Sequence, residues 1–245
     1  SKHLGLDQKT KELLVAPADN VTNSEGIQFL VENPYWEGAK ISLYSAGEES
    51  IASMPNIKVG KFITQVILQN IEVEDIDLSN ATDLRSAWVQ NNQALQKLDL
   101  SYSTIWGQGD KETEGNGTYG SSLMVLGCPI LKEIKLPEKN ELKAYRIDIE
   151  CLDALETFDM SNVKMVAELS IGDLNKDFNL VYPELTIFYS EDGYAGTYFA
   201  CSENTFYRES TQAFLKANYT DIDPDDTVRR LGYTSSLSYD KNKGC

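Results

Sequence analysis

One short segment of this chain is written three times with small changes. It reads LQKLDLS from Leu95, VEDIDLS from Val73 and LETFDMS from Leu155. Each copy belongs to a longer series with the pattern L-x-x-L-x-L, whose members follow one another about every 11 residues. The apolar triplets are Ile63-Val66-Leu68, Val73-Ile76-Leu78, Leu84-Ala87-Val89, Leu95-Leu98-Leu100, Leu131-Ile134-Leu136, Leu142-Tyr145-Ile147, Leu155-Phe158-Met160 and Val166-Leu169-Ile171.

The spacing of these triplets predicts short strands that turn every second side chain inward. Asp77 and Asp99 of the D-L-S signature are 22 residues apart, so one repeat consists of two half-turns. A half-turn is too small to bury its own apolar face, and stacked neighbours make that face continuous. We therefore predict a β-rich, right-handed solenoid with a parallel sheet.

Two further segments make a family resemblance specific. The segment SNATDLRSAWVQNNQALQKLDLS alternates L-D-L-S with N-N-x-x-L, and CPILKEIKLP has the form C-x-x-L-x-x-I-x-L-P. Both resemble the degenerate repeats of leucine-rich-repeat surface proteins of the Bacteroidetes and bacterial surface-antigen type. The resemblance covers about residues 57–190. It implies a leucine-rich-repeat-like fold and a place at the bacterial cell surface.

The segments on either side depart from the series and are predicted to close its two ends. Residues 1–56 contain strand-like runs between turn-rich stretches, which favours an N-terminal cap or a small β region. Residues 191–245 include STQAFLKANY, which has helical spacing, and are interpreted as a C-terminal cap. The domain between them, residues 57–190, holds an inserted loop at residues 106–120.

Charge and composition exclude some classes of function. The net charge of −16 repels phosphate backbones and anionic membranes, so no nucleic-acid partner is expected. No apolar run is long enough for a transmembrane segment, and a lipid anchor, if the protein has one, would lie outside these residues. The single histidine, His3, is close to the start, so a catalytic triad is not expected.

The cysteines and the recurring aspartates are candidate sites that have simpler structural explanations. Cys128 and Cys151 are 23 residues apart, so stacked structural cysteines at a repeat turn are expected, with a disulfide left open. The outward Asp77, Asp99 and Asp159 could form a calcium ladder, but solvated carboxylates are the favoured interpretation. No metal and no cofactor is predicted.

A candidate ligand-binding region is predicted around the inserted loop. The spacing of the series jumps from 11 to 36 between Leu95 and Leu131, and one further strand is expected near SSLMVLG. Aromatic residues flank the insertion, and its acidic residues could accept hydrogen bonds from hydroxyl groups. Packing of these rings onto the solenoid is an equal alternative. The candidate residues are Trp88, Trp106, Tyr119, Asp110, Glu112 and Glu114.

The functional expectation is a non-enzymatic binding or adhesion module outside the cell, which presents a solenoid face to a protein or glycan ligand. It would be lipid-anchored to the outer membrane in its full-length form. Two alternatives remain open at this point. One is a glycan-active enzyme that uses paired carboxylates, and the other is a structural spacer in a surface assembly.

Overall fold

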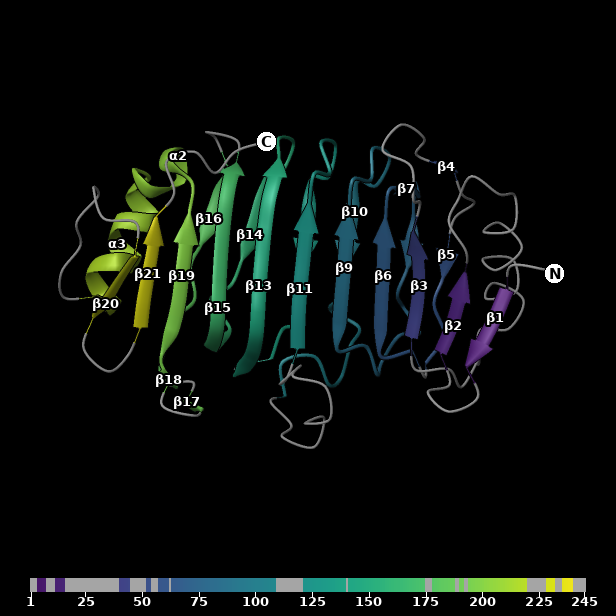
Figure 1. Cartoon of the computed structure of the whole chain (residues 1–245), viewed down its shortest axis with the longest axis horizontal. Coiled ribbons are helices and arrows are strands. Elements are labelled where there is room, and N and C mark those ends of the chain that lie inside the picture. Colours follow the sequence, from purple (N-terminus) through teal and green to yellow (C-terminus); the bar gives the residue numbers. More distant parts are fainter. Residues whose placement is uncertain are drawn as a thin grey trace.

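The computed structural model describes most of the predicted repeat region and parts of both flanks (Figure 1). The described residues are 4–7, 12–15, 40–44, 52–53, 57–61, 63–108, 121–139, 141–174, 178–187, 190–191, 194–219, 228–231 and 235–239.

These residues form strands and two helices. The strands of the first half are β1 (Leu4–Asp7), β2 (Glu12–Val15), β3 (Lys40–Tyr44), β4 (Ala52–Ser53), β5 (Ile57–Lys58), β6 (Gln65–Gln69), β7 (Ile71–Glu72), β8 (Ile76–Asp77), β9 (Ser86–Gln90) and β10 (Lys97–Asp99). The remaining elements are β11 (Ser121–Leu126), β12 (Glu133–Lys135), β13 (Leu142–Leu152), β14 (Thr157–Asp159), β15 (Val163–Leu174), β16 (Asn179–Val181), β17 (Ser190–Glu191), β18 (Tyr194–Ala195), β19 (Thr197–Cys201), α2 (Glu203–Phe206), α3 (Glu209–Asn218), β20 (Val228–Leu231) and β21 (Ser235–Tyr239).

A large sheet runs along the whole molecule. It has 11 strands in the order β1-β2-β3-β6-β9-β11-β13-β15-β19-β21-β20. All neighbours from β2 to β21 pair in parallel, whereas β1 and β20 pair antiparallel at the two ends. In Figure 1 the arrows of β2 to β21 point the same way, and those of β1 and β20 are reversed. Strands from both flanking segments therefore extend the same sheet as the predicted repeats.

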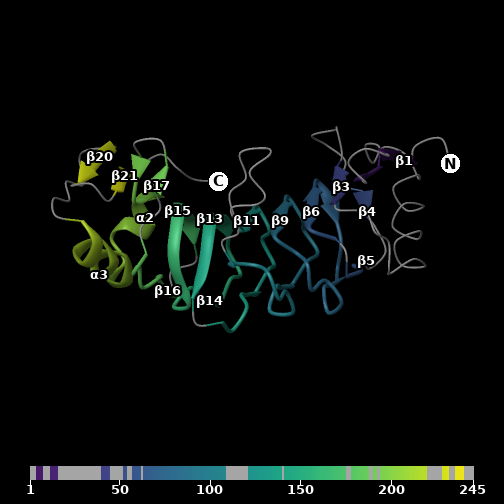
Figure 2. The same ribbon diagram turned by 90° about the horizontal axis from the view of Figure 1, so that it is seen from below.

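A second, smaller sheet lies behind the large one (Figures 1 and 2). It has four parallel strands in the order β10-β12-β14-β16, and two short parallel pairs, β4-β7 and β5-β8, precede it along the chain. From β9 to β16 the chain alternates between the two sheets, with one strand in each per passage. The fold is thus β-rich with parallel sheets, and it is compatible with a solenoid-like architecture.

The alternation of apolar side chains produces the core between the sheets. Strands β6 and β9 share the burial pattern half-buried, buried, half-buried, buried, half-buried. This confirms the predicted inward direction of the apolar triplets, because eight representative members are at most 7% exposed. These residues are Leu78, Leu98, Leu100, Ile134, Leu136, Phe158, Met160 and Leu169.

The aspartate of the recurring D-L-S signature, which reads D-M-S in its third copy, closes a turn at the end of three short strands, β8, β10 and β14. Oδ1 of Asp77, Asp99 and Asp159 accepts a hydrogen bond from the backbone N–H two residues further on, at 2.9, 3.0 and 2.8 Å respectively. A carboxylate held in this way replaces a backbone turn bond. The signature therefore combines a turn residue with a buried residue, and it recurs because the same corner recurs.

The opposite corner, at the carboxyl end of the large-sheet strands, uses a left-handed backbone. Asn70, Asn91, Gly127, Cys151 and Asp173 have φ between 41° and 63° and follow or end β6, β9, β11, β13 and β15. Asn, Asp and Gly tolerate this conformation better than other residues. Next to this corner, the fully buried Asn92 accepts hydrogen bonds at Oδ1 from the N–H groups of Ala94 and Leu95, both at 2.9 Å. The left-handed backbone at Asn91 and the side-chain hydrogen bonds of Asn92 together explain the N-N-x-x-L pattern.

The predicted inward direction is wrong for one residue of the triplets, Tyr145. Tyr145 was assigned to the core by its place in the series, but Ala144 is the buried residue and Tyr145 is half-buried. The pairing of β11 with β13 skips Tyr145, because Ser121 faces Ala144 and the adjacent Ser122 faces Arg146. This bulge turns Tyr145 outward, and its hydroxyl lies 3.4 Å from Oε1 of Glu168.

The predicted extra strand near SSLMVLG is confirmed as β11, which pairs in parallel with β9 and β13. The helical spacing of STQAFLKANY is also confirmed as α3, which buries Phe214 and Leu215. None of the helices in the described part of the chain has the length and hydrophobicity needed to cross a membrane.

Candidate functional site

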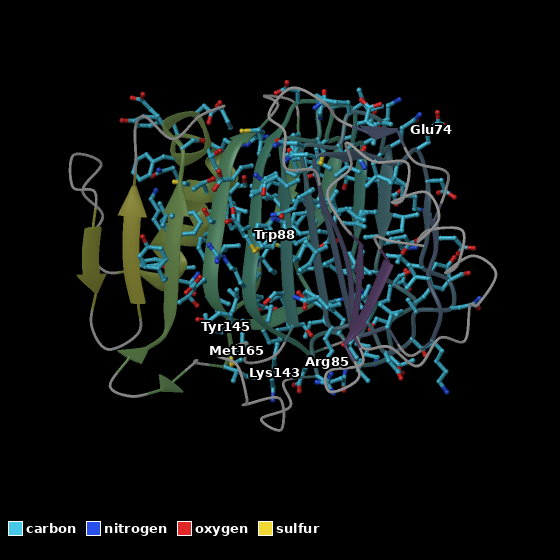
Figure 3. All side chains as sticks on the ribbon, turned by 45° about the vertical axis from the view of Figure 1, so that its right-hand side comes forward. Glu74, Arg85, Trp88, Lys143, Tyr145 and Met165 are labelled. Atoms are coloured by element: carbon cyan, nitrogen blue, oxygen red, sulfur yellow. The ribbon has the colours of Figure 1, made fainter. Side chains whose placement is uncertain are left out.

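Trp88 lies in the middle of β9 and points outward from the large sheet (Figure 3). Its neighbours Ala87 and Val89 are buried, and the Trp88 side chain itself is half-buried. The indole N–H donates to Oε1 of Gln90, at 3.2 Å, so the ring is held by its own strand. The predicted outward direction of Trp88 is therefore confirmed.

The register of the parallel strands builds a surface around this ring. Trp88 stands directly between Ile67 of β6 and Met124 of β11. With the outward positions on either side, the three strands present nine half-buried residues, here called the Trp88 patch. They are Gln65, Ile67, Gln69, Ser86, Trp88, Gln90, Ser122, Met124 and Leu126. From strand spacing alone, the patch measures about 10 Å across the strands and about 13 Å along them.

The Trp88 patch contains no charged side chain, although 24% of the residues of the chain are charged. Its middle row is apolar, and uncharged donors and acceptors lie on both sides of that row. Oε1 of Gln90 also accepts a hydrogen bond from Nε2 of Gln69, at 3.3 Å. The side chains of Gln65, Ser86 and Ser122 make no hydrogen bond with other described residues. They are therefore able to bond to a ligand or to water.

Charged residues begin at the next strand, β13, and contact one another. Asp148 and Glu150 stand beside Met124 and Leu126 in the register. Arg146 lies 3.5 Å from Oδ2 of Asp148 and 3.5 Å from Oε2 of Glu168, so one guanidinium links two carboxylates. On this side the Trp88 patch is thus bordered by an ionic cluster in which Arg146 pairs with both Asp148 and Glu168.

The other candidate residues have different outcomes. For Trp106 the structure shows the second of the two predicted alternatives, packing of the ring, because its side chain is 0% exposed and belongs to the core. The backbone N–H of Trp106 donates to Oγ of Ser103 at 2.9 Å, and that of Gly107 donates to Oγ of Ser121 at 2.6 Å. These bonds turn the chain inward and place the ring in the interior, where it cannot meet a ligand. Asp110, Glu112, Glu114 and Tyr119 lie outside the described residues.

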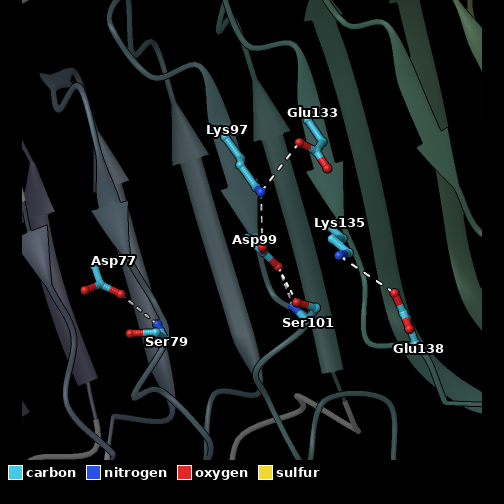
Figure 4. Close-up of polar contacts among 8 residues, drawn as sticks. All are labelled: Asp77, Ser79, Lys97, Asp99, Ser101, Glu133, Lys135 and Glu138. Atoms are coloured by element: carbon cyan, nitrogen blue, oxygen red, sulfur yellow. Dashed lines mark hydrogen bonds and ion pairs between the residues drawn. The ribbon is translucent and has the colours of Figure 1, made fainter.

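Asp77 lies on β8, in the short pair that precedes the smaller sheet, and Asp99 lies on β10 of the smaller sheet (Figure 4). Asp159 is exposed at the end of β14. Lys97 lies 3.4 Å from Asp99 and 3.6 Å from Glu133, and Lys135 stands opposite Asp99 in the register. Burial raises the pKa of Asp99, but hydrogen bonds from Ser101 and the ammonium of Lys97 outweigh it, so the net pKa is below its usual value. Among the described residues, no three Asp, Glu, His or Cys side chains are grouped as a metal site would require.

The cysteines do not stack as expected. Glu150 is the register partner of Leu126. Cys151, which has a left-handed backbone, comes one residue after Glu150, whereas Cys128 comes two residues after Leu126. The two cysteines are therefore one position out of register. Cys151 is disulfide-bonded, and Cys128 and Cys201 are buried thiols. Burial raises the pKa of the Cys128 thiol to about 11, so the nucleophilic thiolate is scarce at neutral pH.

A groove of about 460 Å³ lies between α3 and the chain after β16. Its lining is mostly apolar and includes Leu180, Tyr182 and Phe214. The Tyr182 ring stacks on Phe214 with a centroid distance of 4.7 Å, and its hydroxyl lies 2.8 Å from Oγ1 of Thr211. These contacts fasten the helix to the sheet, so the groove follows from helix packing.

The described surface thus offers one candidate for recognition whose chemistry can be specified, the Trp88 patch. The chain has no match among protein-family models, curated proteins or solved structures, and nothing in these comparisons identifies a leucine-rich-repeat family.

Proposed function

We propose that this protein is a leucine-rich-repeat-like, right-handed solenoid that serves as a binding or adhesion module at a bacterial cell surface. The ligand contacts the outward face of the large sheet at the Trp88 patch. The D-L-S and N-N-x-x-L patterns support the repeat architecture, and so does the alternation of the chain between two parallel sheets. The surface location and an anchor outside these residues rest on the resemblance of the repeats.

The observation that carries the binding proposal is the position of Trp88. The core of such a fold requires inward aliphatic residues, and the inward neighbours Ala87 and Val89 already supply them. A half-buried indole on the outer side of the sheet, between Ile67 and Met124, adds nothing to that core. Tryptophan is enriched among the residues that dominate binding interfaces, because a rigid ring buries a large area at low entropic cost.

A binding role also explains why the patch differs from the rest of the surface. Removing a charge from water is costly unless it is paired, so charged residues are depleted from the centres of interfaces. The Trp88 patch has no charge to desolvate, while Arg146, Asp148 and Glu168 on the neighbouring strands β13 and β15 are paired with each other.

The test compares the wild type with Trp88→Ala on a panel of glycans and extracellular proteins. We expect at least one ligand to bind the wild type and to lose about tenfold or more in affinity with the variant. Assays for released products on the same panel address the enzymatic alternative, and we expect no turnover. A panel in which every bound ligand ignores Trp88→Ala would refute the proposed site.

A further inference from the structure

We infer that the Trp88 patch binds the ring face of an uncharged sugar chain. This inference rests on the proposed function and specifies its ligand class. It starts from the order of chemistry across the patch, which is an apolar row flanked by uncharged polar groups.

The apolar row matches the ring faces of neutral sugars. One face of a pyranose ring exposes mainly C–H bonds, and its hydroxyl groups project around the rim. Ile67, Trp88 and Met124 are consecutive across three parallel strands, so they form a continuous apolar strip about 10 Å long. The hydrogen bond from Nε1 of Trp88 to Gln90, at 3.2 Å, restricts the indole before any ligand arrives.

The flanking groups match the hydroxyl rim. Gln69 and Gln90 lie on one side of the strip, and Gln65, Ser86 and Ser122 lie on the other. Oε1 of Gln90 accepts bonds from both Trp88 and Gln69, and its Nε2 makes no further bond with the described residues. A hydroxyl group both donates and accepts, and amide and hydroxyl side chains can serve either role.

Charge complementarity separates this ligand from the alternatives. An anionic sugar chain would approach a molecule of net charge −16 and find no cation within the patch. A charged protein surface would lose water from its ionic groups without gaining a partner. A neutral sugar chain incurs neither cost.

The experiment measures binding of neutral oligosaccharides of glucose, xylose, mannose and galactose by calorimetry, with polygalacturonate and heparin as anionic probes. We expect a neutral sugar to bind with an affinity that changes little between low and high salt. Trp88→Ala should weaken that binding about tenfold or more, and the fluorescence of the wild type should shift when the sugar covers the ring.

A second variant guards against an effect on folding. Ser86→Asp adds a carboxylate at the rim without touching the core, and it should also weaken sugar binding. Asn179→Asp makes a similar charge change at an exposed position of the smaller sheet and should not. Thermal melting confirms that each variant is folded.

The outcomes distinguish this inference from the proposed function. Binding of a protein or an anionic sugar through Trp88, without any neutral sugar, overturns the ligand class and leaves the binding site standing. Binding of a neutral sugar that both Trp88→Ala and Ser86→Asp leave unchanged overturns the placement. Absence of any ligand on the full panel overturns both.

Discussion

Replacing Leu100 and its neighbour Asp99 tests the fold most directly, because one position is inward and the other outward in the same recurring signature. The Leu100 side chain is 1% exposed, and its backbone N–H donates to the carbonyl of Lys135 at 2.8 Å. Leu100→Ala removes buried carbon atoms and leaves a cavity between two sheets that cannot easily close. We expect the free energy of unfolding to fall by about 2–5 kcal/mol.

Asp99→Ala removes only the turn contacts of the same strand. The lost interactions are hydrogen bonds from the Ser101 N–H at 3.0 Å and hydroxyl at 2.6 Å, and an ion pair with Lys97 at 3.4 Å. Lys97 is half exposed, so the ion pair contributes little. We expect a loss of about 1 kcal/mol, well below that of Leu100→Ala.

The assay is urea unfolding of both variants, followed by circular dichroism and by tryptophan fluorescence. For a chain of 245 residues, each kcal/mol corresponds to about 2–4 °C in Tm, so thermal melts should separate the two variants clearly. Leu78→Ala, at the matching position of another copy, should resemble Leu100→Ala. A larger loss for Asp99→Ala than for Leu100→Ala would mean that the strand is inside out, and it would refute the assignment.

Three further predictions concern a carboxylate, a glycine and a thiol. The lowered pKa of Asp99 stabilises the fold above its unfolded pKa of about 3.9, and this contribution is lost as the pH falls through the folded pKa. The stability difference between the wild type and Asp99→Asn, measured by urea unfolding, should therefore shrink from pH 7 to pH 3, and a constant difference would contradict the assignment. Gly107→Ala should destabilise the protein by about 2–4 kcal/mol, since φ is +78° and the added Cβ would lie 2.7 Å from Cδ2 of Leu142; an unchanged melting curve would argue against this turn. Cys128, buried and with a pKa of about 11, should react with iodoacetamide only in denaturant, as peptide mass spectrometry can show, and rapid labelling of the native protein would place it at the surface instead.

The sequence by itself determined which side chains of the short strands face inward. Strand alternation is a local property, so the triplets containing Leu98, Ile134 and Phe158 could be assigned to the core without knowing what packs against them. The same locality made the outward direction of Trp88 predictable. The prediction from alternation failed at Tyr145, where the strand has a bulge. A bulge depends on how two strands pair, and the spacing of apolar residues in one strand does not specify that pairing.

Only the tertiary structure decided which residues from distant parts of the chain share a surface. Met124 stands beside Trp88 although the insertion separates them in sequence, and the absence of charge around the ring emerges only after β6, β9 and β11 are placed in register. Trp106 shows the converse. Its position at the start of a polar insertion left exposure and burial equally open, and the turn held by Ser103 and Ser121 directs the ring into the core. Periodicity sets the direction of a side chain within a strand, whereas long-range strand pairing and loop geometry select its neighbours.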